Sequence, residues 1–127
     1  MKTLSPRKTI SLKFATLYIY ENYAVSSINE GVVFDTQELE QFQEVFAIYF
    51  PNKPFGLIAD RENDYTVNPV CYAANNEIKN LVGMAVLCYT EANYETAKFT
   101  KPFFNKPLEG FFSFEECITW IKHLLPQ

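Results

Sequence analysis

Histidine and closely spaced cysteines are almost missing from this sequence, and with them the common metal and disulfide sites. His123 is the only histidine, which excludes any site with two histidine ligands. Cys71, Cys88 and Cys117 are odd in number, widely spaced and flanked by apolar residues, a pattern typical of reduced thiols in a core. We therefore expect no metal site and no disulfide.

Glycine is also scarce, and its placement excludes the standard nucleotide-binding motifs. The four glycines are isolated from one another, so no glycine-rich loop can hold a phosphate. His123 lies near the end of the last predicted helix, where a positive charge interacts favourably with the helix dipole. No serine or cysteine in a nucleophile-elbow context accompanies it. We expect no cofactor and no catalytic residue.

Long apolar runs and a strongly basic surface are missing as well. No stretch approaches the roughly 20 apolar residues of a membrane-spanning helix, and Met1–Ile10 has no signal-peptide run, so we expect a cytoplasmic protein without a membrane span. The formal net charge of -4 argues against nucleic acid as a partner. We interpret the only basic cluster as a solvated segment; it consists of Lys2, Arg7, Lys8 and Lys13.

What the chain does contain is enough apolar material for one core. Of its 127 residues, 48% are hydrophobic and 20% charged, which is typical of a folded domain. Aromatic residues make up 17%, and such rings either fill a core or cover an interface. No repeat or linker divides the chain. We expect a polar lead over residues 1–9 and a single domain over residues 10–127.

The opening third has the composition of strands. Ile10–Tyr20 is rich in β-branched and aromatic residues that alternate, which predicts one strand with Ile10, Leu12, Phe14, Thr16, Tyr18 and Tyr20 on one face. Tyr23–Ile28 is predicted to form a hairpin with it, and Gly31–Phe34 a short third extended piece.

Four helices are predicted from capping signals and apolar spacing. Asp35 and Glu38 form a capping-box pattern, and the helix that they begin ends before Pro51. Asn68-Pro69 begins a second helix, whose expected apolar face comprises Val70, Ala73, Ala74, Ile78 and Leu81. Thr90 caps a third helix, and Ser113 with Glu116 begins the last.

Two nearly unbroken apolar runs predict the centre of a sheet. Phe55–Ala59 and Val82–Tyr89 lack the alternation of half-exposed strands, so both faces should be covered by helices. Leu108–Phe112 is predicted as a lateral strand. The expected fold is α/β: a mixed, mostly parallel sheet flanked by about four helices, with a β-hairpin at the start.

The most polar segment follows the first of these central strands, where ligands tend to meet an open sheet. We expect a binding loop there, whose candidate residues are Asp60, Arg61, Glu62, Asn63, Tyr65, Thr66 and Asn68. The carboxylates of this loop have no defined separation in sequence, and we interpret them as solvated or capping groups, not as acid–base catalysts.

Residues Arg61–Pro69 follow the pattern Arg-x-Asn-x-Tyr-Ser/Thr-Val-Asn-Pro, which is similar to one in uncharacterised bacterial proteins. With this pattern, the chain from residue 10 to residue 125 resembles the SpoIIAA-like branch of the STAS superfamily, which has a structural kinship with CRAL-TRIO lipid-binding domains. The segment Pro107–Ile121 resembles the branch's terminal strand and helix.

The resemblance implies a possible phosphorylation switch, and the sequence departs from it. In anti-sigma-factor antagonists of the superfamily, a kinase phosphorylates a serine that follows an aspartate after a central strand. Asp60 resembles that aspartate, but Arg61 stands in place of the serine. Thr66 is the nearest displaced hydroxyl and is the candidate phosphosite.

Two functions follow as hypotheses. The first is a non-enzymatic regulatory module that binds a protein partner through the Asp60–Asn68 loop. The second is a carrier of a lipid or apolar small molecule, with a pocket formed by Tyr72, Phe103, Phe104 and the aromatic first strand. Unpaired strand edges and surplus aromatics also favour a homodimer.

Overall fold

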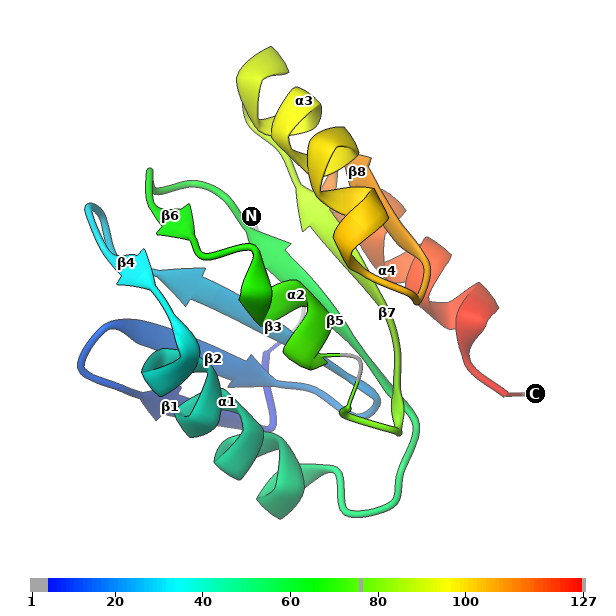
Figure 1. Ribbon diagram of the computed structural model, residues 1–127. Coiled ribbons are helices and arrows are strands. Elements are labelled where there is room, and N and C mark those ends of the chain that lie inside the picture. Colours follow the sequence, from blue (N-terminus) through cyan, green and yellow to red (C-terminus); the bar gives the residue numbers. More distant parts are fainter. Residues whose placement is uncertain (1–4, 76, 127) are drawn as a thin grey trace.

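The computed structural model describes residues 5–75 and 77–126. Within them, six strands form one sheet in the order β1-β2-β3-β5-β7-β8 (Figure 1). Their bounds are β1 (Lys8–Ser11), β2 (Ala15–Ile19), β3 (Tyr23–Ile28), β5 (Phe55–Asp60), β7 (Leu81–Leu87) and β8 (Leu108–Phe111). The β1–β2 and β2–β3 pairs are antiparallel, and the other three pairs are parallel. The predicted mixed, mostly parallel sheet with a hairpin start is confirmed.

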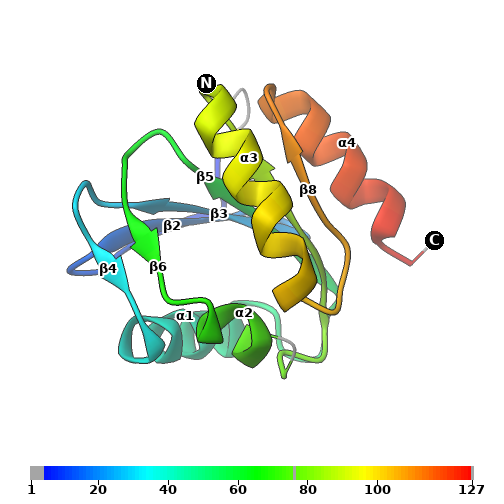
Figure 2. The same ribbon diagram turned by 45° about the horizontal axis from the view of Figure 1, so that its top comes forward.

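Helices cover the sheet from both sides, as the apolar central strands predict (Figure 2). The helices are α1 (Thr36–Tyr49), α2 (Val70–Asn75), α3 (Glu91–Thr100) and α4 (Phe114–Leu124), and a 3-10 turn, η1 (Lys101–Phe103), continues α3. Side chains of α1, α2 and α3 join one apolar cluster with the inner face of the sheet. Those of α4 form a second cluster on the opposite face.

The predicted helix starts are confirmed by their hydrogen bonds. Asp35 Oδ1 accepts from the Thr36 amide at 2.8 Å, and the Asp35 amide donates to Glu38 Oε1 at 2.8 Å, which completes the capping box. The Thr90 and Ser113 hydroxyls each accept from an amide three residues on, at the starts of α3 and α4. Such caps satisfy amides that the first helical turn leaves without partners.

The prediction of one strand over Ile10–Tyr20 was wrong. The segment folds back on itself, and the Leu12 amide donates to the Ala15 carbonyl at 2.8 Å in the turn. The hairpin places Ala15, Leu17 and Ile19 in the core. The residues predicted to share one face are divided: Ile10, Leu12 and Phe14 pack against the first apolar cluster, and Tyr18 and Tyr20 pack in the second. The sheet also begins at Lys8, inside the predicted polar lead.

The second helix was predicted too long, and its predicted apolar face is only partly buried: Ala74 packs against the core, whereas Val70 and Ala73 are exposed. The helix ends at Asn75, so Ile78 and Leu81 lie beyond it. Val70 is 59% exposed, and the side chain that enters the core is Cys71. The cap sets which side chains of the helix face the core. Asn68 Oδ1 accepts from the Val70 amide at 3.1 Å and thereby fixes where the first turn begins.

A second, two-stranded sheet was not predicted. It pairs β4 (Val33–Phe34) with β6 (Thr66–Val67) in parallel. It lies beside the carboxyl ends of β3 and β5 (Figure 1). Among the described residues, no helix has the length and apolar character needed to cross a membrane.

Candidate functional site

The polar loop after β5 is anchored to the segment that precedes α1. The Gly31 amide donates to the Asp64 carbonyl at 2.8 Å, and the Thr66 amide donates to the Val32 carbonyl at 3.1 Å. The side chain of Asn63 donates to the Ile28 carbonyl at 3.0 Å. The loop is therefore held on both sides at the carboxyl edge of the sheet, where it was predicted to lie.

Arg61 stacks on the buried ring of Tyr65 within this loop. The guanidinium carbon lies 4.0 Å from the ring centre, and Nη2 donates to the Tyr65 carbonyl oxygen at 3.1 Å. Among the described residues, the buried Nε of Arg61 has no hydrogen-bond partner. The side chain is half-buried, with its orientation fixed by one stacked ring and one backbone oxygen.

Two phenols lie beside this guanidinium and stay neutral. Burial raises the pKa of Tyr65 to about 12, and the positive charge of Arg61 opposes that rise. Burial also raises the pKa of Tyr72, which Arg61 and a hydrogen bond with Thr100 lower in part. Both residues therefore act at neutral pH as apolar rings with a polar tip.

An open cleft of about 330 Å³ lies over these side chains, between the loop with α2 and the end of α3 with η1. One wall comes from the loop and α2: Arg61, Asp64, Tyr65, Thr66, Val67, Pro69 and Tyr72. The other comes from α3 and η1: Thr96, Phe99, Thr100 and Phe103. Its volume is at the low end of the range for ligand pockets, so it suits one or two side chains or a small molecule.

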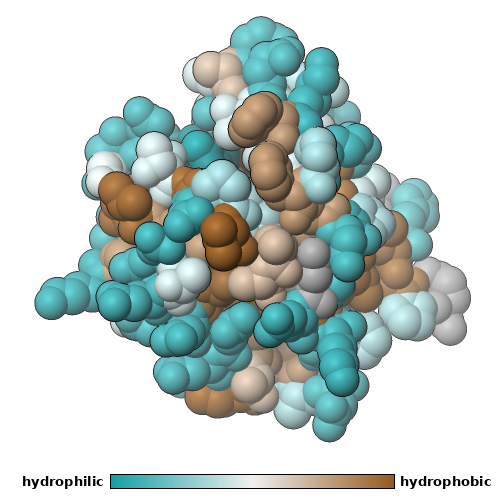
Figure 3. Space-filling view, in the orientation of Figure 1, coloured by the Kyte–Doolittle hydropathy of each residue, from teal (hydrophilic) through white to brown (hydrophobic). Residues whose placement is uncertain are grey.

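The rims of the cleft carry exposed apolar side chains. Phe99 is 70% exposed and its ring centre lies 5.9 Å from that of Phe103, which is also exposed. Val70 and Val33 are also exposed and adjoin lining residues, since Val70 follows Pro69 in the chain and Val33 pairs with Thr66 in the small sheet. Figure 3 shows this face, with apolar surface over α3 and, across a more polar band, over α2 and β4. Exposed apolar groups that gather around a cleft are typical of binding surfaces.

A smaller apolar void lies behind the cleft. It measures about 50 Å³ and is lined by residues of α1, α2 and the inner sheet face, including Leu39, Leu57 and Met84. Tyr65, Val67 and Tyr72 line both spaces. These three side chains therefore separate the surface cleft from the core.

Comparisons with known proteins identify the fold. No family model matches the chain, and no curated protein matches it. A solved structure does match, that of an uncharacterised protein of the DUF3478 family from Shewanella loihica PV-4, described as having a SpoIIAA-like fold. The TM-score is 0.62 at 11% identity, over 90% of this chain and 98% of that one. The fold is SpoIIAA-like. The resemblance inferred from the sequence is thus confirmed for the fold.

The candidate residues of this SpoIIAA-like chain divide into two groups. Arg61, Tyr65 and Thr66 line the cleft. Asp60 and Asn63, like Asn68, hold the loop in place: Asp60 is only 2% exposed and accepts from the Glu62 amide at 3.1 Å. Glu62 is exposed and does not line the cleft.

Asp60 has a further contact that sequence did not predict. Burial and a hydrogen bond with Asp60 raise the pKa of Tyr89, which follows the neighbouring strand β7. Asp60 thus ties together the ends of two central strands. Asp60 ends β5 and has a structural role, and Arg61 is the first residue of the loop that follows.

The α3 wall of the cleft was missed by sequence reasoning. Thr96, Phe99 and Thr100 face the loop across the cleft, although Thr96 is 28 residues beyond Asn68, where the loop ends. The spacing of Phe99 and Phe103, four residues apart, is the one local signal that two rings share a side of the chain.

The apolar pocket predicted around Tyr72, Phe103, Phe104 and the first strand does not form as expected. Tyr72 and Phe103 do line the cleft. Phe104 is buried in the inner core, whereas Tyr18 and Tyr20 pack with α4 on the opposite face of the sheet. The turn within Ile10–Tyr20 accounts for this error, because it separates Phe14 from Tyr18 and Tyr20, which pack on the opposite face of the sheet.

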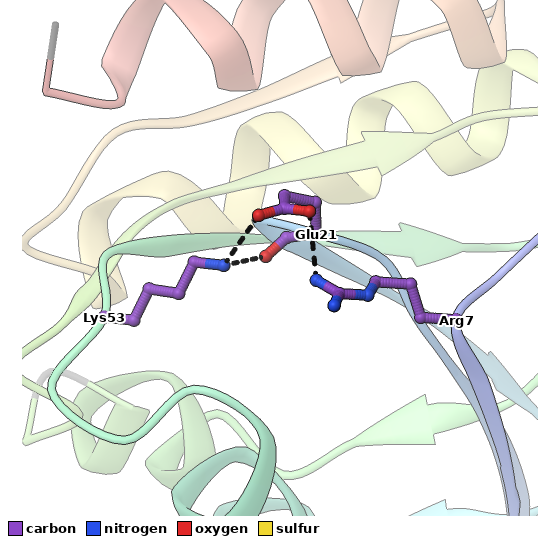
Figure 4. Close-up of polar contacts among 3 residues, drawn as sticks. All are labelled: Arg7, Glu21 and Lys53. Atoms are coloured by element: carbon purple, nitrogen blue, oxygen red, sulfur yellow. Dashed lines mark hydrogen bonds and ion pairs between the residues drawn. The ribbon is translucent and has the colours of Figure 1, made fainter.

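The described members of the predicted basic cluster, Arg7, Lys8 and Lys13, are exposed and do not line the cleft, and they do not gather at one place, since Asn29 at the carboxyl end of β3 donates to the Lys13 carbonyl at 3.3 Å. Arg7 Nη1 contacts Glu21 Oε1 at 3.0 Å, and Lys53 Nζ contacts Glu21 Oε2 at 3.4 Å (Figure 4). Lys2 lies outside the described residues. Glu21 is in the turn before β3, at the end of the sheet opposite the cleft. Such exposed ion pairs stabilise the fold by at most ~1 kcal/mol.

Proposed function

We propose that this chain is a non-enzymatic, STAS-like regulatory module that binds a protein partner through the cleft and its rims, which we call the cleft face. The cleft face comprises the 330 Å³ cleft together with Val33, Val70, Phe99 and Phe103. The observation that carries the proposal is that exposed aromatic side chains lie directly on the rim of this open cleft. Partners commonly bury such anchors at the centre of an interface.

The cleft residues favour recognition over bond-making. The cleft is lined by hydroxyls, phenols of raised pKa, one guanidinium and one carboxylate, and His123 lies exposed in the last turn of α4, on the other side of the sheet. A paired nucleophile and base, which acyl or phosphoryl transfer would need, is not among the cleft's lining residues. The proposed location is the cytoplasm, which suits three buried cysteines in the thiol form.

Quantitative capture from native cells tests the proposal. The wild-type chain and two variants, Phe99→Glu and Ile48→Glu, are used as baits. Ile48 is the matched control because it is 68% exposed, much like Phe99, and lies on α1 away from the cleft. A partner that is lost with Phe99→Glu, kept with Ile48→Glu and reconstituted from purified proteins supports the proposal. Partners retained equally by all three baits would contradict it.

A second candidate function is binding of an apolar small molecule. It is favoured by the void behind the cleft, since Tyr65 and Tyr72 are shared walls whose movement would join the two spaces. Native mass spectrometry of protein purified from its own cells tests it. A retained ligand supports this function, and the mass of the bare chain alone would remove it.

The homodimer stays a prediction. The outer strands of the sheet are β1 and β8, and their free edges are the surfaces that self-association would use. Light scattering at several protein concentrations distinguishes a dimer from a monomer.

A further inference from the structure

Within the part of the chain that the structure describes, Arg61 forms no ion pair. The ion pairs found within residues 5–75 and 77–126 involve Arg7, Lys53, Lys98 and Lys101, and none reaches Arg61. A half-buried guanidinium that makes no direct ion pair has lost part of its hydration without a carboxylate in contact to replace it. An anion that enters the cleft would supply such a contact.

The side chain is also prearranged for such a partner. The ring of Tyr65 lies against one face of the guanidinium, and its backbone oxygen accepts from Nη2. These two contacts limit the rotamers of a long side chain, so less conformational freedom is lost when a ligand binds. A planar guanidinium held in this way matches the planar geometry of a carboxylate.

The surroundings restrict which anion fits. Asp64 lines the same wall as Arg61, and its negative charge disfavours an anion of high charge such as phosphate. The other groups beside Arg61 are Thr66, Thr96 and Thr100, which can hydrogen-bond, and the neutral phenols of Tyr65 and Tyr72. A single carboxylate therefore suits the site better than a dianion.

The opposite wall requires an apolar group next to that carboxylate. Phe99 and Phe103 face the loop across the cleft, and Tyr72 and Val67 add apolar surface beside Arg61. A ligand with a charge alone would leave these rings in water. A ligand that carries an aromatic or aliphatic group would cover them.

We propose that the cleft recognises a carboxylate carried beside an aromatic or aliphatic side chain, with the carboxylate on Arg61 and the apolar group against Phe99 and Phe103. The partner would present this pair as a segment of its own chain, an acidic residue or carboxyl terminus next to a bulky apolar residue. The inference rests on the proposed function, because it names the chemistry that the partner offers to the cleft face.

The test compares two small probes that share the ring and the acetyl group and differ only in having a charged carboxylate or a neutral amide. N-acetyl-phenylalanine carries a carboxylate beside a phenyl ring, and N-acetyl-phenylalaninamide is its neutral counterpart. Each is titrated into the ¹⁵N-labelled full chain, followed by the amide signals of the cleft residues and the Nε–H signal of Arg61. We expect the acid to bind at least about tenfold more tightly than the amide and to shift the Nε–H signal of Arg61.

Variants separate the guanidinium from general electrostatics. Arg61→Gln is expected to bind acid and amide alike, whereas Arg7→Gln, which removes an exposed arginine outside the cleft, keeps the wild-type preference. Arg61→Lys keeps the charge but not the planar fork, and is expected to retain only part of the preference. Equal binding of acid and amide by the wild-type chain would overturn the inference, and this comparison does not depend on any variant folding.

The two proposals can fail separately. If Phe99→Glu abolishes partner capture while the wild-type chain binds acid and amide alike, the carboxylate inference falls and the protein-binding function stands. If the wild-type chain prefers the acid but partner capture is indifferent to Phe99→Glu, the protein-binding function falls, and with it the assignment of the carboxylate to a partner protein.

Discussion

The side-chain amide of Asn68 donates from Nδ2 to Asp35 Oδ1 at 3.0 Å, and thereby joins the starts of two helices. Asp35 caps α1, and the Oδ1 of Asn68 accepts from the Val70 amide at the start of α2. The backbone of Asn68 closes the β4–β6 pair, because its amide donates to the Phe34 carbonyl at 2.9 Å. One residue thus fixes the wall of the cleft that α2 and β6 provide.

Replacing Asn68 by alanine should weaken this wall. The change removes a cap and a side-chain hydrogen bond, so we expect the free energy of unfolding to fall by about 1–2 kcal/mol. Urea unfolding measures the loss. Thr36→Ala is the control. The Thr36 side chain is exposed in the first turn of α1, and the backbone amide of residue 36, which donates to Asp35, is kept in the variant. A loss for Asn68→Ala no larger than for this control would contradict the assigned role.

Gly56 tests how closely α4 packs on β5. A Cβ atom at this position would lie 2.5 Å from two side-chain atoms of Ile121. We expect Gly56→Ala to destabilise the chain by ~1–3 kcal/mol through overpacking. Ile121→Val removes one of the clashing atoms, so the double variant should be less destabilised than the sum of the two single changes. Strictly additive losses would show that the two residues do not contact.

Stability should fall in alkali because buried acids have raised pKa values. Burial raises the pKa of Cys117 from its ordinary value of 9.0 to about 12, and those of Tyr23 and Tyr65 from 10.0 to about 12. The unfolded chain releases these protons first, so its free energy drops relative to the folded state as pH rises. We expect the urea midpoint to be constant below about pH 9 and to decline between about pH 9 and 12.

The Cys117→Ala variant tests how much of the fall in the urea midpoint is due to the thiol of Cys117. Cys117→Ala removes the thiol and should flatten the first part of the fall, around pH 9, where thiols of the unfolded chain ionise ahead of its tyrosines. The comparison uses the slope of the midpoint with pH, since the alanine also removes packing in the second core. An unchanged slope would mean that Cys117 does not titrate differently in the two states.

Thr66 remains the candidate phosphosite, and its position makes a defined prediction. The Thr66 side chain is exposed and lines the cleft, while the Thr66 backbone amide donates a hydrogen bond to the Val32 carbonyl. Thr66→Glu should therefore leave stability within about 0.5 kcal/mol of the wild type, as is usual for surface changes. It should weaken binding of N-acetyl-phenylalanine, because a negative charge would then stand beside Arg61. Undiminished binding would argue against a phosphorylation switch at this residue.

The sequence predicts most of the architecture because its strongest signals are local or compositional. The Asp35 and Glu38 pair marks the start of α1, and the unbroken apolar run in β7 marks a strand covered on both faces. The division of Ile10–Tyr20 into two strands depends on distant residues, namely those that Ala15, Leu17 and Ile19 contact in the core. Alternation alone fits both one strand and two, so the error reflects tertiary packing.

The candidate site is predictable on one side only. Arg61 and Thr66 lie in a polar segment directly after a buried strand, which fold geometry assigns to the binding edge. The opposite wall depends on where α3 crosses the sheet, and nothing local to Thr96 or Phe99 encodes that crossing. The exposure of Phe99 is a property of the assembled surface, and so only the structure reveals it.

Mapping the interface on the purified complex tests the central claim most directly. Amide signals of the ¹⁵N-labelled chain are compared with and without the unlabelled partner identified by capture. The account predicts that the perturbed residues gather on the cleft face, around Val70, Phe99 and Phe103, while Ile48 on α1 and Trp120 on α4 stay unchanged. Perturbations centred on α4 or on the edge of β1, with the cleft face unaffected, would contradict it.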